Sequence, residues 1–165
     1  MDIQKVISNA WAEIKNDYDQ KHLLWEWALQ SAFYHHIRTK VELLWGDNLR
    51  VFPEFCIYSE KLNKNQFIDI AIVSLNPTKT DGHLSERVGK IHALIEIKYQ
   101  FGGYALKWAV KDMEKLEELR KGRKDKPDCF MVYICEYTNE KHGEESMLKN
   151  WTNVKVLAMH ENIKK

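Results

Sequence analysis

The chain has 165 residues, of which 44% are hydrophobic and 30% are charged, and its formal net charge is +1. This composition is typical of a globular protein, and we expect a single domain over residues 1–165. The balanced charge excludes an overall basic field that would demand a nucleic-acid partner, although a local groove can still be basic. No run approaches the ~18 consecutive apolar residues of a membrane span, so we expect no membrane partner.

The cysteines and the N-terminal segment bear on location. Cys56, Cys129 and Cys135 each lie in an apolar run without close pairing, which predicts small buried thiols. The N-terminal residues are charged and amphipathic, unlike a secretory signal. Together these features predict a reducing, cytoplasmic location. Because no CxxC or HxxxH spacing occurs, we expect no zinc site.

Two helices are predicted at the start of the chain. Over residues 3–16, apolar residues recur at helical spacing and predict a short amphipathic helix. A longer helix is expected over about 22–45, closed by Gly46-Asp47-Asn48. Its inner face is predicted from steps of three and four to comprise Leu23, Trp27, Gln30, Tyr34, Ile37, Val41 and Leu44.

The rest of the chain alternates between strands and helices. Strands over 50–59, 67–75 and 91–101 suit an antiparallel meander with a long hairpin loop over 74–90. A helix over 104–121, with an inner face of Leu106, Val110, Met113 and Leu116, leads to a nearly continuous apolar strand over 129–137. That strand should lie parallel to 91–101 through a right-handed crossover. A helical piece over 144–151 and a strand over 154–160 complete an α/β fold with a mixed central sheet flanked by helices.

The stretch ALIEIKYQ, residues 93–100, ends a buried strand with charged residues. Because side chains alternate along a strand, Glu96, Lys98 and Gln100 share one face, opposite Ile97 and Tyr99. An acid two residues before a lysine is a weak signal, since chance predicts about three copies in this composition. The chain has three, and the other two lie in the charged N-terminal region. Only the strand context singles out the third copy.

Asp69, within FIDIAIV, is the second anomaly, because aspartate is disfavoured in strands and is rarely buried without a partner. If the two strands pair, Asp69 approaches Glu96, and the two carboxylates repel each other. A divalent cation would relieve this repulsion, and oxygen ligands suit Mg²⁺. The alternative is a structural ion pair between Lys98 and Asp69 or Glu96 at a half-exposed strand end.

FIDIAIV followed by ALIEIK resembles the PD-(D/E)XK, or restriction-endonuclease-like, nuclease superfamily. Asp69 matches the first acid of that pattern, Glu96 the second and Lys98 the lysine. The resemblance implies a restriction-endonuclease-like αβββαβ core. It is specific over about residues 50–110 and looser over about 20–160, and Ile68 stands where the pattern has proline.

The resemblance also implies accessory residues. Members often add a glutamate from the first core helix, and Glu26 is the natural match, with Gln30 one turn further on; alternatively, Glu26 caps an exposed stripe. Apart from the resemblance, Glu54 is a candidate because its charge interrupts an apolar strand. It is expected to share a face with Phe52 and Cys56, and either joins the site in a supporting role or sits at a sheet edge. Gln100 matches a glutamine found two positions after the lysine, where it would position water or phosphate.

The implied function is metal-dependent hydrolysis of phosphodiester bonds, with nucleic acid, and DNA in particular, as the expected substrate. Asp69, Glu96 and the carbonyl of Ile97 would bind Mg²⁺, for which Mn²⁺ can substitute, and Lys98 would orient the attacking water or stabilise the phosphate.

Three alternatives stay open for function and partners. A non-catalytic nucleic-acid-binding or assembly module could retain the fold. The chain could instead act as a homodimer or with a partner protein through an aromatic surface. Lysines at 107, 111 and 115 form either a phosphate-contacting stripe or a solvated helix face.

Overall fold

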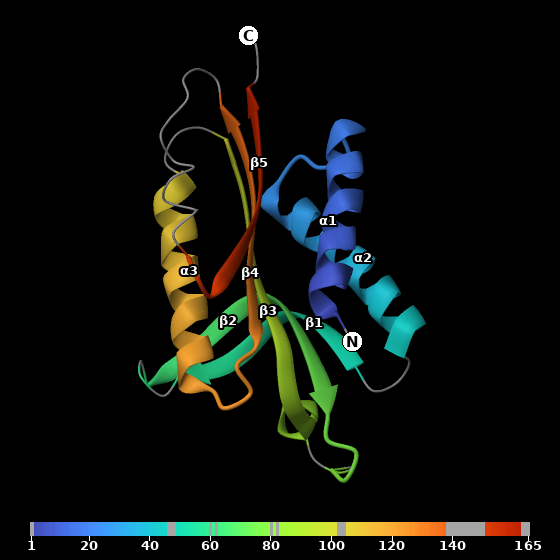
Figure 1. Cartoon of the computed structure of the whole chain (residues 1–165), viewed down its shortest axis with the longest axis vertical. Helices are drawn as coiled ribbons and strands as arrows, with labels where there is room; N and C mark the ends of the chain where they lie inside the picture. The colour runs from blue at the N-terminus through green and yellow to red at the C-terminus, as the bar shows by residue number, and fades with distance from the viewer. Residues whose placement is uncertain are drawn as a thin grey trace.

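A five-stranded mixed sheet with the order β1-β2-β3-β4-β5 forms the centre of the fold (Figure 1). This computed structural model describes residues 2–45, 49–59, 61, 63–79, 81, 83–101, 105–137 and 151–162. β1, β2 and β3 are antiparallel, whereas β3, β4 and β5 are parallel. The strands are β1 (Leu49–Ser59), β2 (Lys64–Leu75), β3 (Val88–Phe101), β4 (Asp128–Tyr137) and β5 (Val154–Asn162).

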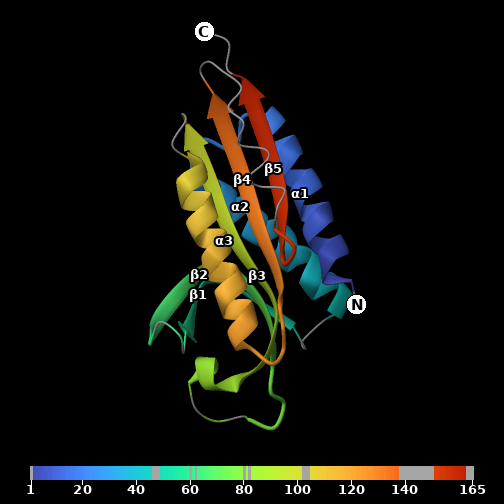
Figure 2. The ribbon, with the colours of Figure 1, turned by 60° about the vertical axis from the view of Figure 1, so that its left-hand side comes forward.

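Helices cover both faces of this sheet. Helices α1 (Ile3–Asp19) and α2 (Glu26–Trp45) lie on one face, and α3 (Ala105–Gly122) lies on the other (Figures 1 and 2). A short 3-10 helix, η2 (Leu84–Arg87), lies between β2 and β3. The predicted αβββαβ order, antiparallel meander and parallel crossover are therefore confirmed. Among the described residues no helix is both long and apolar enough to cross a membrane.

The two N-terminal helices bury their apolar residues between themselves and the sheet. α1 begins at an N-cap, because the Asp2 side chain accepts a hydrogen bond from the Lys5 N–H. The predicted inner face of α2 is partly wrong: Leu29, Phe33, Ile37 and Val41 are buried, while Trp27 is 68% exposed. The spacing of Trp27 and Tyr34 led to the wrong helical face, because amphipathic aromatic residues also occupy the flank of a helix.

Several boundaries also differ from expectation. α2 begins at Glu26 rather than at residue 22, and the connection between β2 and β3 is shorter than the predicted loop, because β2 reaches Leu75 and β3 begins at Val88. Cys129 and Cys135 are buried as predicted, but Cys56 is exposed. The helix end predicted at 46–48 lies outside the described residues, as does the helix predicted over 144–151 apart from Trp151.

The buried face of α3 contains a polar residue. Ala109, Met113, Leu116 and Leu119 are buried against the sheet, and Val110 is half-buried. Steps of three and four from Ala109 to Leu116 pass through Asp112, so this carboxylate also points toward the sheet. The prediction for Met113 and Leu116 is confirmed, and the side chain of Leu106 lies outside the described residues.

The side-chain alternation of β1 and β2 breaks at one shared step. Residues two apart should face the same way, yet Ile68 packs with α3 whereas Ile70 packs with α1 and α2. On β1, Phe52 and Phe55 both pack on the α3 side, so the alternation breaks at Glu54. The ladder passes from Pro53↔Ile70 to Phe55↔Ile68 without pairing Glu54 and Asp69. Beyond this step β1 and β2 stay paired while β2 leaves β3 (Figure 1).

Candidate active site

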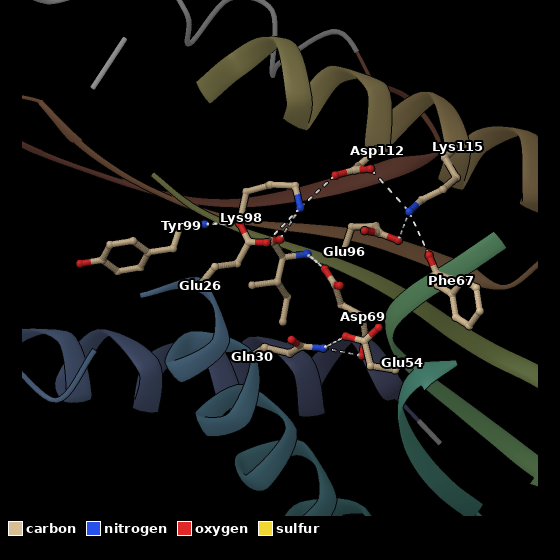
Figure 3. A network of polar contacts seen from close by, with 11 residues as sticks. Glu26, Gln30, Glu54, Phe67, Asp69, Glu96, Lys98, Tyr99, Asp112 and Lys115 are labelled. Atoms are coloured by element: carbon tan, nitrogen blue, oxygen red, sulfur yellow. Dashed lines mark hydrogen bonds and ion pairs between the residues drawn. The ribbon is translucent and has the colours of Figure 1, made fainter. Parts of the chain in front are cut away.

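Beyond the point where β2 stops pairing with β3, two carboxylates accept hydrogen bonds from the free edge of β3. The β2–β3 ladder ends at Ile70↔Ile95, so the next β3 amides on that edge need other acceptors. The Ile97 N–H donates to Asp69 Oδ2 at 2.6 Å, and the Tyr99 N–H donates to Glu26 Oε2 at 3.3 Å. Departure of one strand thus brings acidic residues from β2 and α2 to the strand that carries Glu96 and Lys98 (Figure 3).

Asp69 and Glu96 form an acidic pair in which Glu96 is buried and Asp69 is half-buried. Glu96 is 2% exposed, and burial raises its pKa to about 8; the nearby Asp69 charge adds to the rise, and Lys115 opposes it. Burial also raises the pKa of Asp69, against the opposing effect of the Ile97 N–H and the Lys98 charge. Both carboxyls therefore lack the positive charge that would fully stabilise their ionised forms.

Lys98 lies between the two helical layers. Its Nζ is 3.3 Å from Glu26 Oε1 on α2 and 3.2 Å from Asp112 Oδ2 on α3, and it donates to the Ile97 carbonyl at 3.1 Å. Burial lowers the pKa of Lys98, but Asp112, Glu26 and Asp69 outweigh that effect and raise the pKa above its usual value. Lys98 is therefore an ammonium ion throughout the neutral range. The described contacts of Lys98 differ from the predicted ion pair with Asp69 or Glu96.

Gln30 and Glu54 form the α2–β1 side of the site. Gln30 Nε2 donates to Glu54 Oε1 at 2.7 Å and to the Asp69 carbonyl at 3.3 Å (Figure 3). Glu54 has a φ of 48°, in the left-handed region that costs a non-glycine residue about 1–2 kcal/mol. This conformation turns Glu54 toward α2 while Phe52 packs on the α3 side, so the prediction that they share a face is wrong.

Asp112 and Lys115 belong to the site but were not among the predicted site residues. Lys115 Nζ lies 2.7 Å from Glu96 Oε1, as an ion pair rather than a well-angled hydrogen bond, and 3.5 Å from Asp112 Oδ1. It also donates to the Phe67 carbonyl at 3.0 Å. Lys115 therefore neutralises a buried carboxylate, and its place in a phosphate-contacting stripe is not supported. The available sequence signal was Asp112 at a core-facing helical position.

Gln100 does not join this network in the part of the chain that the structure describes. It lies two residues past Lys98, opposite Cys135 of β4. Its Oε1 is buried, and among the described residues it has no hydrogen-bond partner. The structure thus brings together Glu26, Glu54, Asp69, Glu96 and Lys98, and leaves Gln100 beside them.

The donor chemistry of the site fits Mg²⁺. Among the described residues no three His, Cys, Asp or Glu side chains already surround one point. Mg²⁺, however, is usually bound by one or two carboxylates together with waters and substrate phosphates. Asp69, Glu96 and the Ile97 carbonyl offer such oxygens. The site has five carboxylates, those of Glu26, Glu54, Asp69, Glu96 and Asp112. They outnumber its two ammonium groups, Lys98 and Lys115, which contact Glu26, Glu96 and Asp112.

Comparison with known proteins adds little to this description. No protein-family model matches the chain, and no curated protein is significantly similar to it. Among solved structures, the cAAA-bound form of NucC from P. aeruginosa ATCC27853 is similar, with 12% sequence identity and a TM-score of 0.41. The match covers 81% of this chain and 62% of the NucC chain. At this distance the likeness says nothing about the chemistry of the site.

Proposed function

We propose that this protein is a metal-dependent nuclease that hydrolyses phosphodiester bonds, with DNA as the expected substrate. The observation that carries the proposal is the pair of the half-buried Asp69 and the buried Glu96 beside Lys98 at the open edge of β3. An anionic phosphate would be repelled by this carboxylate excess unless a cation were bound. Two carboxylates and a carbonyl suit Mg²⁺, or Mn²⁺ in its place.

Each residue has a role that follows from its contacts. Asp69, Glu96 and the Ile97 carbonyl would hold the metal, which when bound lowers the pKa of water and neutralises charge on the phosphate. Lys98 carries a fixed positive charge, so it donates hydrogen bonds to the attacking water or a phosphate oxygen rather than accepting a proton. Glu26 and Asp112 position Lys98 from the two layers. Gln30 holds Glu54 and the backbone of Asp69 in place.

The decisive experiment replaces Lys98, the fixed cation of the site. We expect Lys98→Ala to reduce nicking of supercoiled plasmid in Mg²⁺ by about 100-fold or more, because charge-stabilising donors contribute on that scale. Its circular dichroism should match that of the wild type, since Glu26 is half-exposed and can be solvated. The matched control is Lys61→Ala, which removes an exposed lysine 3.3 Å from Glu118, outside the site. Wild-type nicking by Lys98→Ala would contradict the proposal.

Metal binding tests the same site independently of cleavage. Calorimetric titration of Mg²⁺ or Mn²⁺ should detect binding to the wild type and a large loss of affinity in Asp69→Asn. Chelation with EDTA should abolish nicking. If the wild type binds no metal and nicks no plasmid, yet still binds nucleic acid, the non-catalytic module becomes the better description.

A further inference from the structure

A groove continues from the proposed catalytic site between α2 and β1. Along α2, Gln30 contacts the site, and Tyr34 and Arg38 follow at intervals of one turn. Along β1, the chain runs from Glu54 back to Arg50 over the same stretch, although the break in alternation means that Arg50 and Phe52 do not share the face of Glu54. Residues 49–52 of β1 line a groove of about 540 Å³ together with Tyr34, Arg38, Val41 and Glu42 of α2. The eight helical residues from Gln30 to Arg38 and the four strand residues from Glu54 to Arg50 both span about 12–13 Å, so the two segments cover the same length.

The groove combines aromatic rings with guanidinium groups. The Arg38 guanidinium lies 6.0 Å from the centre of the Tyr34 ring, donates to the Tyr34 hydroxyl at 3.1 Å, and forms an ion pair with Glu42 at 2.6 Å. Arg50 lines the opposite wall. Trp27 lies one turn before Gln30 on the same flank of α2, and its ring is largely exposed. Aromatic faces with nearby cations are the elements that bind unpaired nucleotides.

We infer that this groove, lined by Tyr34, Arg38 and Arg50, and the exposed Trp27 further along the same flank of α2 bind the single-stranded part of a nucleic-acid substrate next to the scissile phosphate. The inference rests on the proposed function, because it assigns the groove to the substrate of that site. Arginines contact phosphates, while Trp27 and Tyr34 stack on unpaired bases. A length of about 12 Å accommodates only a few nucleotides at about 3.4 Å each. A base-paired strand has no free base faces to offer these rings.

Binding without cleavage tests the groove directly. The probe is a fluorescein-labelled 12-nucleotide single-stranded DNA, measured by fluorescence anisotropy in EDTA. Arg38→Gln and Trp27→Leu should each raise Kd at least about fivefold, through loss of a phosphate contact or of stacking. Glu42→Gln should lower Kd, because it removes the negative charge beside Arg38. A duplex of the same sequence should bind at least about tenfold more weakly than the single strand.

A matched pair of controls and a second substrate separate this inference from the proposed function. Lys121 and Glu117 form a similar i,i+4 pair on α3, 3.0 Å apart and away from the groove, so Lys121→Gln should leave Kd unchanged. Hydrolysis of thymidine 5′-(4-nitrophenyl) phosphate, which is too short to reach the groove, should be the same in Arg38→Gln and wild type. If the wild type hydrolyses neither substrate but the binding pattern holds, the proposed function fails while the groove assignment stands.

Three results would overturn the groove assignment. The first is an unchanged Kd in both Arg38→Gln and Trp27→Leu, with circular dichroism confirming that they fold. The second is equal binding of duplex and single strand. The third is a wild-type dimer in size-exclusion chromatography that Trp27→Leu converts to a monomer, which would assign this surface to a second copy of the chain.

Discussion

At the scale of single residues, Lys98 is defined by where its partners come from. Glu26 reaches it from α2 and Asp112 from α3, so one ammonium group is held by carboxylates from opposite layers of the fold. These carboxylates raise its pKa, and Lys98 cannot act as a base near neutral pH. Sequence alone identifies Lys98 and Glu26 as candidate site residues, but it does not predict that they pair. Asp112, whose charge is the largest of those that raise the pKa of Lys98, was not among the predicted site residues.

Replacing Lys115 tests whether its ammonium group and a bound Mg²⁺ compete for Glu96. Lys115→Met leaves the buried Glu96 without its ion-pair partner and the Phe67 carbonyl without its donor. We expect the free energy of unfolding in EDTA to fall by about 1–3 kcal/mol, since Glu96 can protonate instead of remaining an unpaired charge. Mg²⁺ should then stabilise this variant more than the wild type, because binding to the folded state restores positive charge beside Glu96.

Urea denaturation with and without Mg²⁺ measures both effects. Lys111→Met is the matched control: its ammonium lies 4.6 Å from the centre of the Trp108 ring, and it belongs to the same helix. That control should change stability little and gain no extra stabilisation from Mg²⁺. Equal stabilisation of Lys115→Met and wild type by Mg²⁺ would argue that Glu96 does not bind the metal.

At the scale of elements, the open edge of β3 creates the site, and the sequence predicts it only in part. Strand periodicity correctly indicates that Glu96 and Lys98 share a face and that Asp69 lies beside them. It cannot indicate that β1 and β2 break their alternation together at Glu54 and Asp69, because that break depends on which residues are opposite each other across the ladder. The same limitation explains the error for Glu54, whose positive φ reverses the expected direction of its side chain.

The turn between α3 and β4 is fastened to β3 by Asp125. Its carboxylate accepts from the Ile91 N–H at 2.9 Å and pairs with Arg123 at 2.8 Å. Burial alone would raise the pKa of Asp125, but Arg123 and the Ile91 N–H outweigh it and lower the pKa below its usual value. Such a group stabilises the fold above the unfolded carboxyl pKa of about 4 and loses that effect as pH falls through its lower folded value.

Asp125→Asn should therefore reduce the free energy of unfolding by about 1–2 kcal/mol at pH 7. The difference from the wild type should shrink as the pH falls below about 4, because the wild-type carboxyl then becomes neutral too. Urea denaturation at a series of pH values measures this, with the exposed Asp81→Asn as control. A difference that stays constant down to pH 2 would show that the charge of Asp125 is not what holds the turn.

At the scale of the whole molecule, the site lies where the two packed layers meet. One core joins α1 and α2 to the sheet, the other joins α3 to it, and Lys98 contacts a carboxylate from each side. Sequence periodicity predicts the apolar faces of α1 and α3 and only part of that of α2, and it does not predict how far a helix is displaced along the sheet. Asp112 and Lys115 reach Lys98 and Glu96 only because α3 packs on the sheet beside the end of β3 that carries them. For that reason Asp112 and Lys115 were not predicted as site residues, although the sequence shows on which side of the helix they lie.

The charge distribution of the chain predicts how binding of single-stranded DNA depends on salt. The net charge is +1, and the proposed groove supplies two guanidinium groups, Arg38 and Arg50. Binding of single-stranded DNA should therefore depend weakly on salt, with a slope of log K against log salt of about −1.4 for two phosphate contacts. Affinity should fall about sevenfold between 50 and 200 mM salt. A slope steeper than about −3 would mean that further cations, such as those of Arg120–Lys126 at and after the end of α3, share the contact. We expect these cations to contribute little, because Lys126 donates to the Arg120 and Lys121 carbonyls at the end of α3 and Arg120 donates to the Pro127 carbonyl.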